Sequence, residues 1–211
     1  MLLLLWACAL NSPPSEAQSS ASEANLSPVA AASPEAASVA EPVPPLCPAT
    51  FPNESPAQGI LVQKGARRLS YYEAGTLADY NGAPACFAMS LGFTPEGHKQ
   101  REGDGRTPEG RYHIYTKNPK SQFYLSLGIS YPNAADAKAG LDAGIIDQAA
   151  YNRVLKNPSW PPSNTGLGGL IFIHGGGVGS DWTWGCVALE NEHMKYLFDR
   201  IQTGAAVLIL P

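Results

Sequence analysis

The 211-residue chain lacks the usual features of nucleic-acid-binding, membrane-spanning and metal-binding proteins. It has no basic patch or stripe, the feature with which proteins bind a phosphate backbone. After the first ten residues, no apolar run approaches the roughly 20 residues that a transmembrane helix needs. Neither a CxxC nor an HExxH spacing occurs, so the sequence suggests no metal site. We therefore expect no nucleic-acid partner and no bound metal.

Motifs of two other protein classes are incomplete. Residues 174–177 (HGGG) match the oxyanion motif of lipase-like α/β-hydrolases, but the G-x-S-x-G nucleophile elbow of that class is missing. No G-K-[ST] follows the glycines, which excludes a phosphate-binding loop of that type.

The N-terminal residues 1–10 (MLLLLWACAL) are strongly apolar and predict the core, or the remnant, of an export signal. Residues 5–8 resemble a lipobox, in which Cys8 would be lipidated and become the mature N-terminus. A plain cleaved signal with an incidental cysteine is the alternative. Either reading predicts a protein of the periplasm or cell envelope, and the first adds a lipid anchor at Cys8.

Residues 11–57 are mostly Ser, Pro, Ala and Glu and contain no Lys or Arg. Such a segment has too few apolar side chains to offset the entropy lost on ordering, so we predict a disordered linker. The packed domain is expected over residues 58–211. This domain is nearly neutral, because all 14 Lys and Arg follow residue 63 while several acidic residues lie in the linker.

The domain is predicted to be mainly β with minor α. Apolar alternation and β-branched runs place strands at residues 60–63, 68–73, 84–91, 111–116, 123–130, 170–173 and 205–210. Helices are expected at 134–141 and 145–155, followed by a last helix that Asn191 caps and Gly204 ends. The long loops 92–110 and 157–169 are rich in Gly and Pro, as functional loops often are.

Residues 170–189 (LIFIHGGGVGSDWTWGCVAL) carry the main chemical signal. A short apolar strand ends at His174, glycines follow, and Cys186 lies twelve residues further on. A cysteine nucleophile needs a base and donors for the developing oxyanion. We predict Cys186 as the nucleophile and His174 as its base, oriented by the main-chain carbonyl of Gly175. The amides of Gly185 and Cys186 are the predicted oxyanion hole.

Several ordered blocks resemble the L,D-transpeptidase catalytic (YkuD-type) domain. They are residues 103–112 (GDGRTPEGRY), 171–175, 183–186 and 204–211, with 125–136 (LSLGISYPNAAD) and 181–183 closer to a YafK-like branch. The resemblance implies a mixed β-sheet or β-sandwich catalytic domain with a C-terminal helix and strand. It also implies that the cysteine attacks the carbonyl of the diamino acid at position three of a peptidoglycan stem and releases D-alanine. The acyl group then passes to an amine or to water, and members need no metal or cofactor.

The residues expected to contact a peptidoglycan stem are Arg106, Tyr131, Trp182, Thr183 and Trp184. The aromatic rings would wall a groove, and Arg106 would meet stem carboxylates. Packing of the rings and a solvated loop charge are the alternatives. Asp181 is expected to fix its loop through hydrogen bonds to the backbone.

The sequence also departs from the commoner family pattern. Trp184 stands where a second His is usual, Ala188 replaces an Arg or Asn, and the spacer between His174 and Cys186 is short. The YafK-like branch shares these features. The main hypothesis is therefore an L,D-transpeptidase that cross-links or remodels the cell wall. A hydrolase that cuts protein–peptidoglycan or L,D-linkages is the alternative, with an envelope lipoprotein as substrate or acceptor. A non-catalytic peptidoglycan-binding module is a third hypothesis.

The four cysteines leave one pair for a disulfide. If Cys8 is removed or acylated and Cys186 is catalytic, then Cys47 and Cys86 remain. An exported protein folds in an oxidising compartment, so this pair is a candidate bridge between the linker and the domain.

Overall fold

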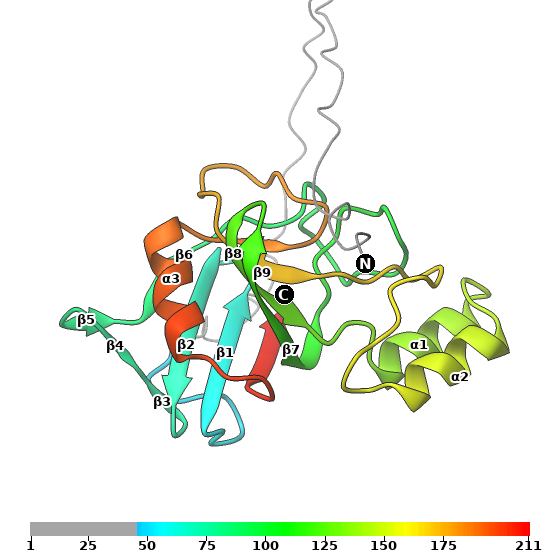
Figure 1. Cartoon of the computed structure of the whole chain (residues 1–211), viewed down its shortest axis with the longest axis horizontal. Helices are drawn as coiled ribbons and strands as arrows, with labels where there is room; N and C mark the ends of the chain where they lie inside the picture. Colours follow the sequence, from blue (N-terminus) through cyan, green and yellow to red (C-terminus); the bar gives the residue numbers. More distant parts are fainter. Residues whose placement is uncertain (1–45) are drawn as a thin grey trace, which may run out of the picture. The chain divides into compact units, whose positions relative to one another are not determined.

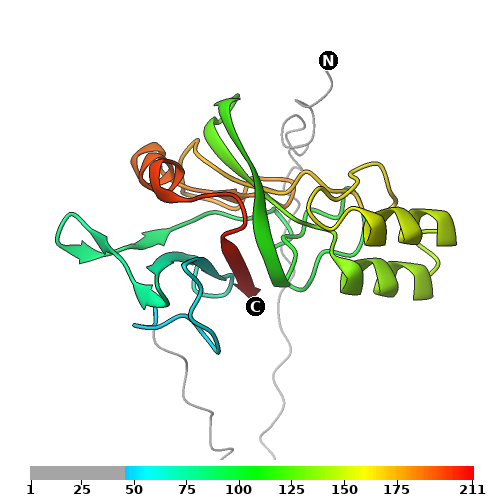
Figure 2. The same cartoon turned by 60° about the horizontal axis from the view of Figure 1, so that its bottom comes forward.

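The computed structural model describes residues 46–211, which form a mixed β-sheet with three helices (Figures 1 and 2). The strands are β1 (Gln58–Gln63), β2 (Arg68–Glu73), β3 (Thr76–Leu77), β4 (Asp79–Tyr80), β5 (Ala83–Pro84), β6 (Cys86–Ala88), β7 (Gly110–Ser121), β8 (Tyr124–Ile129), β9 (Phe172–His174), β10 (Val187–Ala188) and β11 (Ala206–Leu210). The helices are α1 (Ala134–Asp142), α2 (Gln148–Lys156) and α3 (Asn191–Arg200). The predicted class, mainly β with a C-terminal helix and strand, is confirmed.

The larger sheet has nine strands in the order β10-β9-β8-β7-β11-β1-β2-β3, and β6 also pairs with β2. Strands β4 and β5 form a separate two-stranded ribbon. The last strand, β11, lies between β7 and β1, antiparallel to the first and parallel to the second. The C-terminal strand therefore joins the two halves of the sheet, as Figure 1 shows.

Alternation along the strands places one face of the sheet on the main core. In β1, Ile60 and Val62 belong to the main hydrophobic cluster, whereas Leu61 between them belongs to a second cluster. Helix α3 packs on the main-core face and contributes Met194 and Leu197, both fully buried. Burial of such side chains typically stabilises a fold by about 1.5–3 kcal/mol each.

The second cluster covers the opposite face of β1, β2 and β11, and the predicted linker contributes to it. Phe51 is 3 % exposed and packs edge-to-face on Tyr72 with 5.3 Å between ring centroids. The Tyr72 hydroxyl also donates to the Pro48 carbonyl at 2.8 Å. The prediction of disorder is therefore wrong for residues 46–57. It rested on the average composition of the segment, which does not show that a single apolar residue, Phe51, is buried against the sheet. The predictions for residues 1–10, for Cys8 and for residues 11–45 lie outside the described residues.

Several predicted elements begin or end elsewhere; β7, for example, continues to Ser121, beyond the predicted end at residue 116. The strand expected at 84–91 is shorter, although Ala85, Phe87, Met89 and Leu91 all face the main core as its alternation predicted. The N-cap of α3 is Glu190, and Asn191 is the first helical residue. The helix ends at Arg200 rather than Gly204, because the backbone becomes extended at Ile201, whose side chain is fully buried.

The long loop 92–110 is tied to β1 by a buried cation. The ammonium of Lys64, whose side chain is 3 % exposed, donates to the carbonyls of Gly97 (2.6 Å) and Thr107 (3.0 Å) and to Glu109 (2.7 Å). These three acceptors match the three donors of an ammonium, which offsets the cost of its burial.

The other three histidines are partly enclosed. His193 has 20 % of its side chain exposed and stacks on Phe87 at 4.4 Å. His98 lies 3.2 Å from the Asp136 carboxylate, which raises the pKa of the imidazole. Burial lowers the pKa of His113, which lies in β7.

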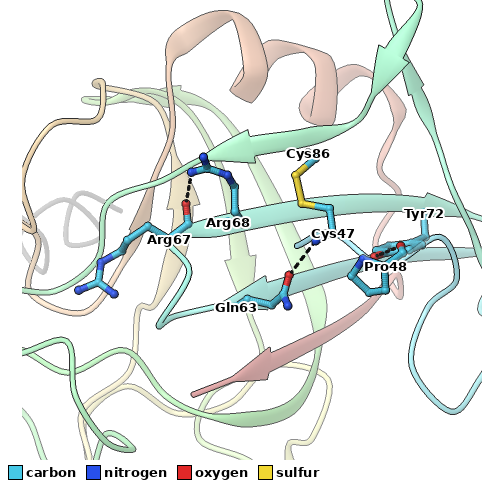
Figure 3. Close-up of a disulfide and its surroundings, with 7 residues drawn as sticks. All are labelled: Cys47, Pro48, Gln63, Arg67, Arg68, Tyr72 and Cys86. Carbon is cyan, nitrogen blue, oxygen red and sulfur yellow. Dashed lines mark hydrogen bonds between the residues drawn. A yellow bond between two sulfur atoms is a disulfide. The ribbon is translucent and has the colours of Figure 1, made fainter. Parts of the chain in front are cut away.

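The disulfide between Cys47 and Cys86 is present, with 6.0 Å between the Cα atoms (Figure 3). It joins the N-terminal segment to β6, and the Cys47 amide also donates to the Gln63 side chain at 3.4 Å. The remaining cysteine of residues 46–211, Cys186, lies directly before β10.

Removal of this disulfide should destabilise the domain. The bridge spans 39 residues of sequence, and loss of a loop constraint of that size is expected to cost about 4 kcal/mol. Urea unfolding of the double variant Cys47→Ser/Cys86→Ser, followed by circular dichroism, measures this cost. Leu46→Ser, at an exposed neighbouring position, is the matched control. Equal midpoints for the double variant and the control would contradict the expectation.

Candidate active site

The predicted catalytic residues lie on the sheet face opposite the main core. In β9, Ile173 belongs to the core, so Phe172 and His174 point to the other face. In β8, Leu127 belongs to the core, and its neighbours Ser126 and Gly128 point away from it. The register pairs Ser126 with His174 and Gly128 with Phe172, so these four residues form one surface.

The parallel pairing of β9 and β10 brings Cys186 to the same surface. Ala188 is level with His174 and Val187 with Ile173, so Cys186 comes level with Phe172 and shares the face of the imidazole. Neighbouring strands lie about 4.8 Å apart, so Cys186 lies diagonally across the strand pair from His174, two residues before Ala188, the residue level with His174. The Cys186 side chain has 0 % exposure, and its sulfur lies 3.8 Å from the Leu170 carbonyl oxygen.

The His174 ring is held in one tautomer. Its Nδ1 lies 2.6 Å from the carbonyl oxygen of Gly175. Because a carbonyl can only accept, Nδ1 carries the proton and Nε2 keeps its lone pair. Nε2 is buried and has no hydrogen-bond partner within residues 46–211. Burial lowers the pKa of His174, and the Gly175 contact opposes this in part, so the neutral base is favoured.

Two aromatic rings enclose this imidazole. Phe123, directly before β8, stacks on it with 4.6 Å between centroids and 26° between planes. Trp182 approaches the same ring at 5.5 Å and lies 5.4 Å from Phe123. The structure therefore places Trp182 against the ring of His174. Phe123 was missed by sequence reasoning, because it belongs to no motif and only the pairing of β8 with β9 brings it to His174.

Hydrogen bonds fix the loop between His174 and Cys186 at several points, of which two involve predicted residues. The Asn191 side chain accepts the Gly176 amide at 2.9 Å, a use that explains why it does not cap α3. Asp181 accepts the Leu91 amide at 2.9 Å and pairs with Arg67 at 2.6 Å. The expected structural role of Asp181 is confirmed.

Thr183 organises the turn before the cysteine. Its hydroxyl donates to the Cys186 carbonyl at 2.7 Å and accepts the Gly185 amide at 3.1 Å. Gly185 has φ = +116°, and a Cβ there would lie 2.4 Å from the Arg106 carbonyl oxygen. Glycine is thus required by both conformation and space. In this structure the Gly185 amide is engaged by Thr183, which is itself fully buried.

The other predicted substrate contacts are dispersed. Trp184 packs edge-to-face on Phe93 at 4.5 Å rather than beside Trp182. Arg106 reaches the site through its main chain, at Gly185. Tyr131 is 1 % exposed, and its hydroxyl donates to the Leu167 carbonyl at 3.3 Å, a position that favours the packing alternative.

Residues 46–211 contain neither a metal-binding cluster nor a membrane-spanning helix. No group of three or more His, Cys, Asp or Glu side chains there is arranged to hold a metal ion. No helix in the same range has the length and apolarity to cross a bilayer. A cavity of about 510 Å³ lies beside the loop 92–110, lined by Lys64, Gly65, Arg67, Pro95, Glu96, Gly97, Glu109 and Pro211, none of which is a predicted catalytic residue.

Removing the ring that stacks on His174 should raise the pKa of the imidazole. Phe123→Ala admits water to the ring, which stabilises its charged form and moves the pKa up toward the ordinary value of about 6.5. An NMR titration of the imidazole signals measures the change. Phe93→Ala is the control, because Phe93 is exposed and packs on Trp184 instead. Identical titrations of wild type and Phe123→Ala would show that enclosure by Phe123 does not cause the lowered pKa of His174.

Asp181 should stabilise the fold more than its ion-pair partner does. Asp181→Ala leaves the Leu91 amide without its acceptor, at an expected cost of about 1–3 kcal/mol. Arg67→Ala removes the partly exposed ion pair and a hydrogen bond to the Lys64 carbonyl, which is expected to cost about 1 kcal/mol. Asp181→Asn keeps an acceptor for Leu91 and should lie between the two. Urea unfolding measures the free energy of unfolding of the three variants. A larger loss of stability in Arg67→Ala than in Asp181→Ala would contradict this account.

Comparison with known proteins assigns the family. The model of the L,D-transpeptidase catalytic domain (YkuD) matches residues 57–209. YafK of Escherichia coli (strain K12) is 29 % identical over 117 residues, covering 54 % of this chain and 35 % of that protein. ErfK/SrfK of Salmonella typhimurium (strain LT2) is 27 % identical over 161 residues, covering 72 % and 44 %. Both relatives carry L,D-transpeptidase in their names, and this chain spans less than half of their length.

The fold agrees with this match. The K307A mutant of Pgp2, the helical cell shape determining protein of Campylobacter jejuni, superimposes with a TM-score of 0.50 and 23 % identity. The match covers 76 % of this chain and 48 % of that one. The chain therefore belongs to the L,D-transpeptidase catalytic domain (YkuD) family.

Proposed function

We propose that this protein is a cysteine-dependent L,D-transpeptidase that acts on peptidoglycan tetrapeptide stems in the cell envelope. The observation that supports it most is the common sheet face of Cys186 and His174 on the paired strands β9 and β10. The Nδ1 contact with the Gly175 carbonyl supports the role of His174 as a neutral base.

The proposed reaction has two halves. In the first, Nε2 of His174 takes the thiol proton while the sulfur attacks the carbonyl of the third stem residue. The C–N bond to D-alanine breaks, and His174 returns the proton to the departing amine, which leaves a thioester. In the second, an acceptor amine attacks the thioester, loses its proton to His174 and regenerates the thiol. Bonds and protons balance without an oxidant or a metal.

The oxyanion would be stabilised by the amides of Cys186 and Gly185. The Gly185 amide points to the Thr183 hydroxyl in this structure, so it becomes available to a substrate only when that hydrogen bond opens. Positioning of the amide by Thr183 is thus part of the proposal.

The acceptor in the second half of the reaction distinguishes the transpeptidase from the main alternative, a hydrolase. Water in place of an amine makes the same site a hydrolase, because it would release the acyl group from the same thioester. A protein–peptidoglycan link, with an envelope lipoprotein as one partner, would be a substrate of that hydrolase. The third candidate, a wall-binding module without catalysis, is favoured by the 0 % exposure of the Cys186 side chain.

Substitution of either catalytic residue should abolish turnover. Purified full-length protein with disaccharide-tetrapeptides should release D-alanine, and Cys186→Ala or His174→Ala should lower the rate by at least about 10³-fold. Mass spectrometry of the muropeptides reports the fate of the acyl group, a cross-link for transfer and a tripeptide for hydrolysis. Leu46→Ser, at an exposed position outside the site, is the control and should keep the wild-type rate.

Thiol labelling separates the enzyme from the binding module. Iodoacetamide should add one mass increment that Cys186→Ala loses. If the wild-type protein binds sacculi but shows neither turnover nor this label, the wall-binding module replaces the proposed enzyme.

A further inference from the structure

A row of aromatic rings runs from His174 toward solvent on the catalytic face of the sheet. Phe172 is two residues before His174 and is level with Gly128 of β8. The Tyr115 ring lies over Gly128, where a Cβ would come within 2.6 Å of it, and is 6.5 Å from Phe172. Trp160, in the loop after α2, packs on Tyr115 at 4.8 Å. The row therefore runs from Phe172 through Tyr115 to Trp160.

Trp160 presents a rigid ring to solvent. It is 58 % exposed, and few other large apolar side chains in residues 46–211 are exposed. The ring planes of Trp160 and Tyr115 meet at 80°. Such an edge-to-face contact covers at most one face of the indole. Its amide donates to the Asn157 carbonyl at 3.1 Å, and three prolines, at positions 158, 161 and 162, restrict the loop.

From this row we infer that Trp160 is a binding platform for the N-acetylhexosamine glycan of peptidoglycan, whose stem peptide enters at Cys186. The inference rests on the proposed function. A hexosamine ring offers a flat set of C–H bonds, whose partial positive charge complements the negative face of an indole. Asn157 and Ser159, exposed beside Trp160 in the chain, provide hydrogen-bonding groups for the sugar hydroxyl and acetamide groups.

The length of the stem supports a glycan as the occupant. Three stem residues span roughly 10 Å when extended, between the reacting carbonyl and the sugar that carries the stem. Two ring-to-ring steps, 6.5 Å and 4.8 Å, lead from Phe172 beside the catalytic residues to Trp160. A lipid surface could also hold an exposed indole, but it would not require the indole to end a row that begins at Phe172, two residues before His174 on the same strand face.

The chain provides matched variants. Leu155 is also apolar, is 42 % exposed and lies on α2, outside the row, so Leu155→Ala controls for loss of exposed apolar surface. Trp160→Phe keeps a flat ring and Trp160→Ala removes it. Because Trp160 is exposed, all three variants are expected to fold, and unchanged thermal unfolding confirms this.

Binding without turnover gives the direct test. The probe is a peptide-free oligosaccharide of alternating N-acetylglucosamine and N-acetylmuramic acid, titrated by calorimetry into the full-length protein. Wild type and Leu155→Ala should bind equally, Trp160→Ala should bind about tenfold more weakly, and Trp160→Phe should recover part of the loss. No binding by wild type, or equal binding by Trp160→Ala, would overturn the platform. Trp160-dependent binding to phosphatidylethanolamine–phosphatidylglycerol vesicles in place of the glycan would assign the ring to a lipid surface instead.

Turnover gives a second readout and separates the two proposals. Trp160→Ala should lower the ratio of kcat/KM for a disaccharide-tetrapeptide to that for the free tetrapeptide by about tenfold, and Leu155→Ala should leave this ratio unchanged. An unaltered ratio in Trp160→Ala overturns the platform and spares the proposed enzyme. If wild type turns over neither substrate, the proposed enzymatic function is wrong. The glycan titration then tests the proposed binding platform by itself.

Discussion

The parallel pairing of β9 with β10 is the constraint on which the site depends. Both strands are very short, and their register alone makes Ala188 level with His174 and carries Cys186 to the same face. A shift by one residue would turn Cys186 into the core and Val187 toward the base. The register is supported from outside the pair, because Ser90 exchanges two backbone hydrogen bonds with Ala188 and the Leu189 amide donates to the His174 carbonyl.

The loop between the two strands is correspondingly constrained. Its glycines remove side chains where the chain passes against other backbone, as at Gly185 beside the Arg106 carbonyl. The loop is anchored where Asp181 pairs with Arg67 and accepts the Leu91 amide, and where the Gly176 amide donates to the Asn191 side chain of α3. The family match makes this arrangement an L,D-transpeptidase-type domain, while the chemistry at Cys186 remains our proposal.

The two faces of the sheet serve different purposes. One face is buried by α3 and the main core. The other is closed by Phe51 and its neighbours over β1, β2 and β11, and carries His174, Phe172 and the proposed catalytic residues at β8 to β10. The disulfide at Cys47 fastens the segment that closes the first part of this face (Figure 3). The remaining part carries the row of aromatic rings that we assign to the glycan.

The sequence by itself determined the fold class, most strands and the family, and it predicted Cys186 and His174 as a catalytic pair. These follow from local alternation, from a strand that ends at a histidine and from ordered motif blocks, all of which are contiguous in the chain. The tertiary structure alone decided the surroundings of the base. Phe123 stacks on His174, Asn191 holds Gly176 instead of capping α3, and Tyr131 is buried although it looked like a groove residue. Strand pairing joins residues some 15 to 50 positions apart, and no local pattern records which partner a side chain will meet.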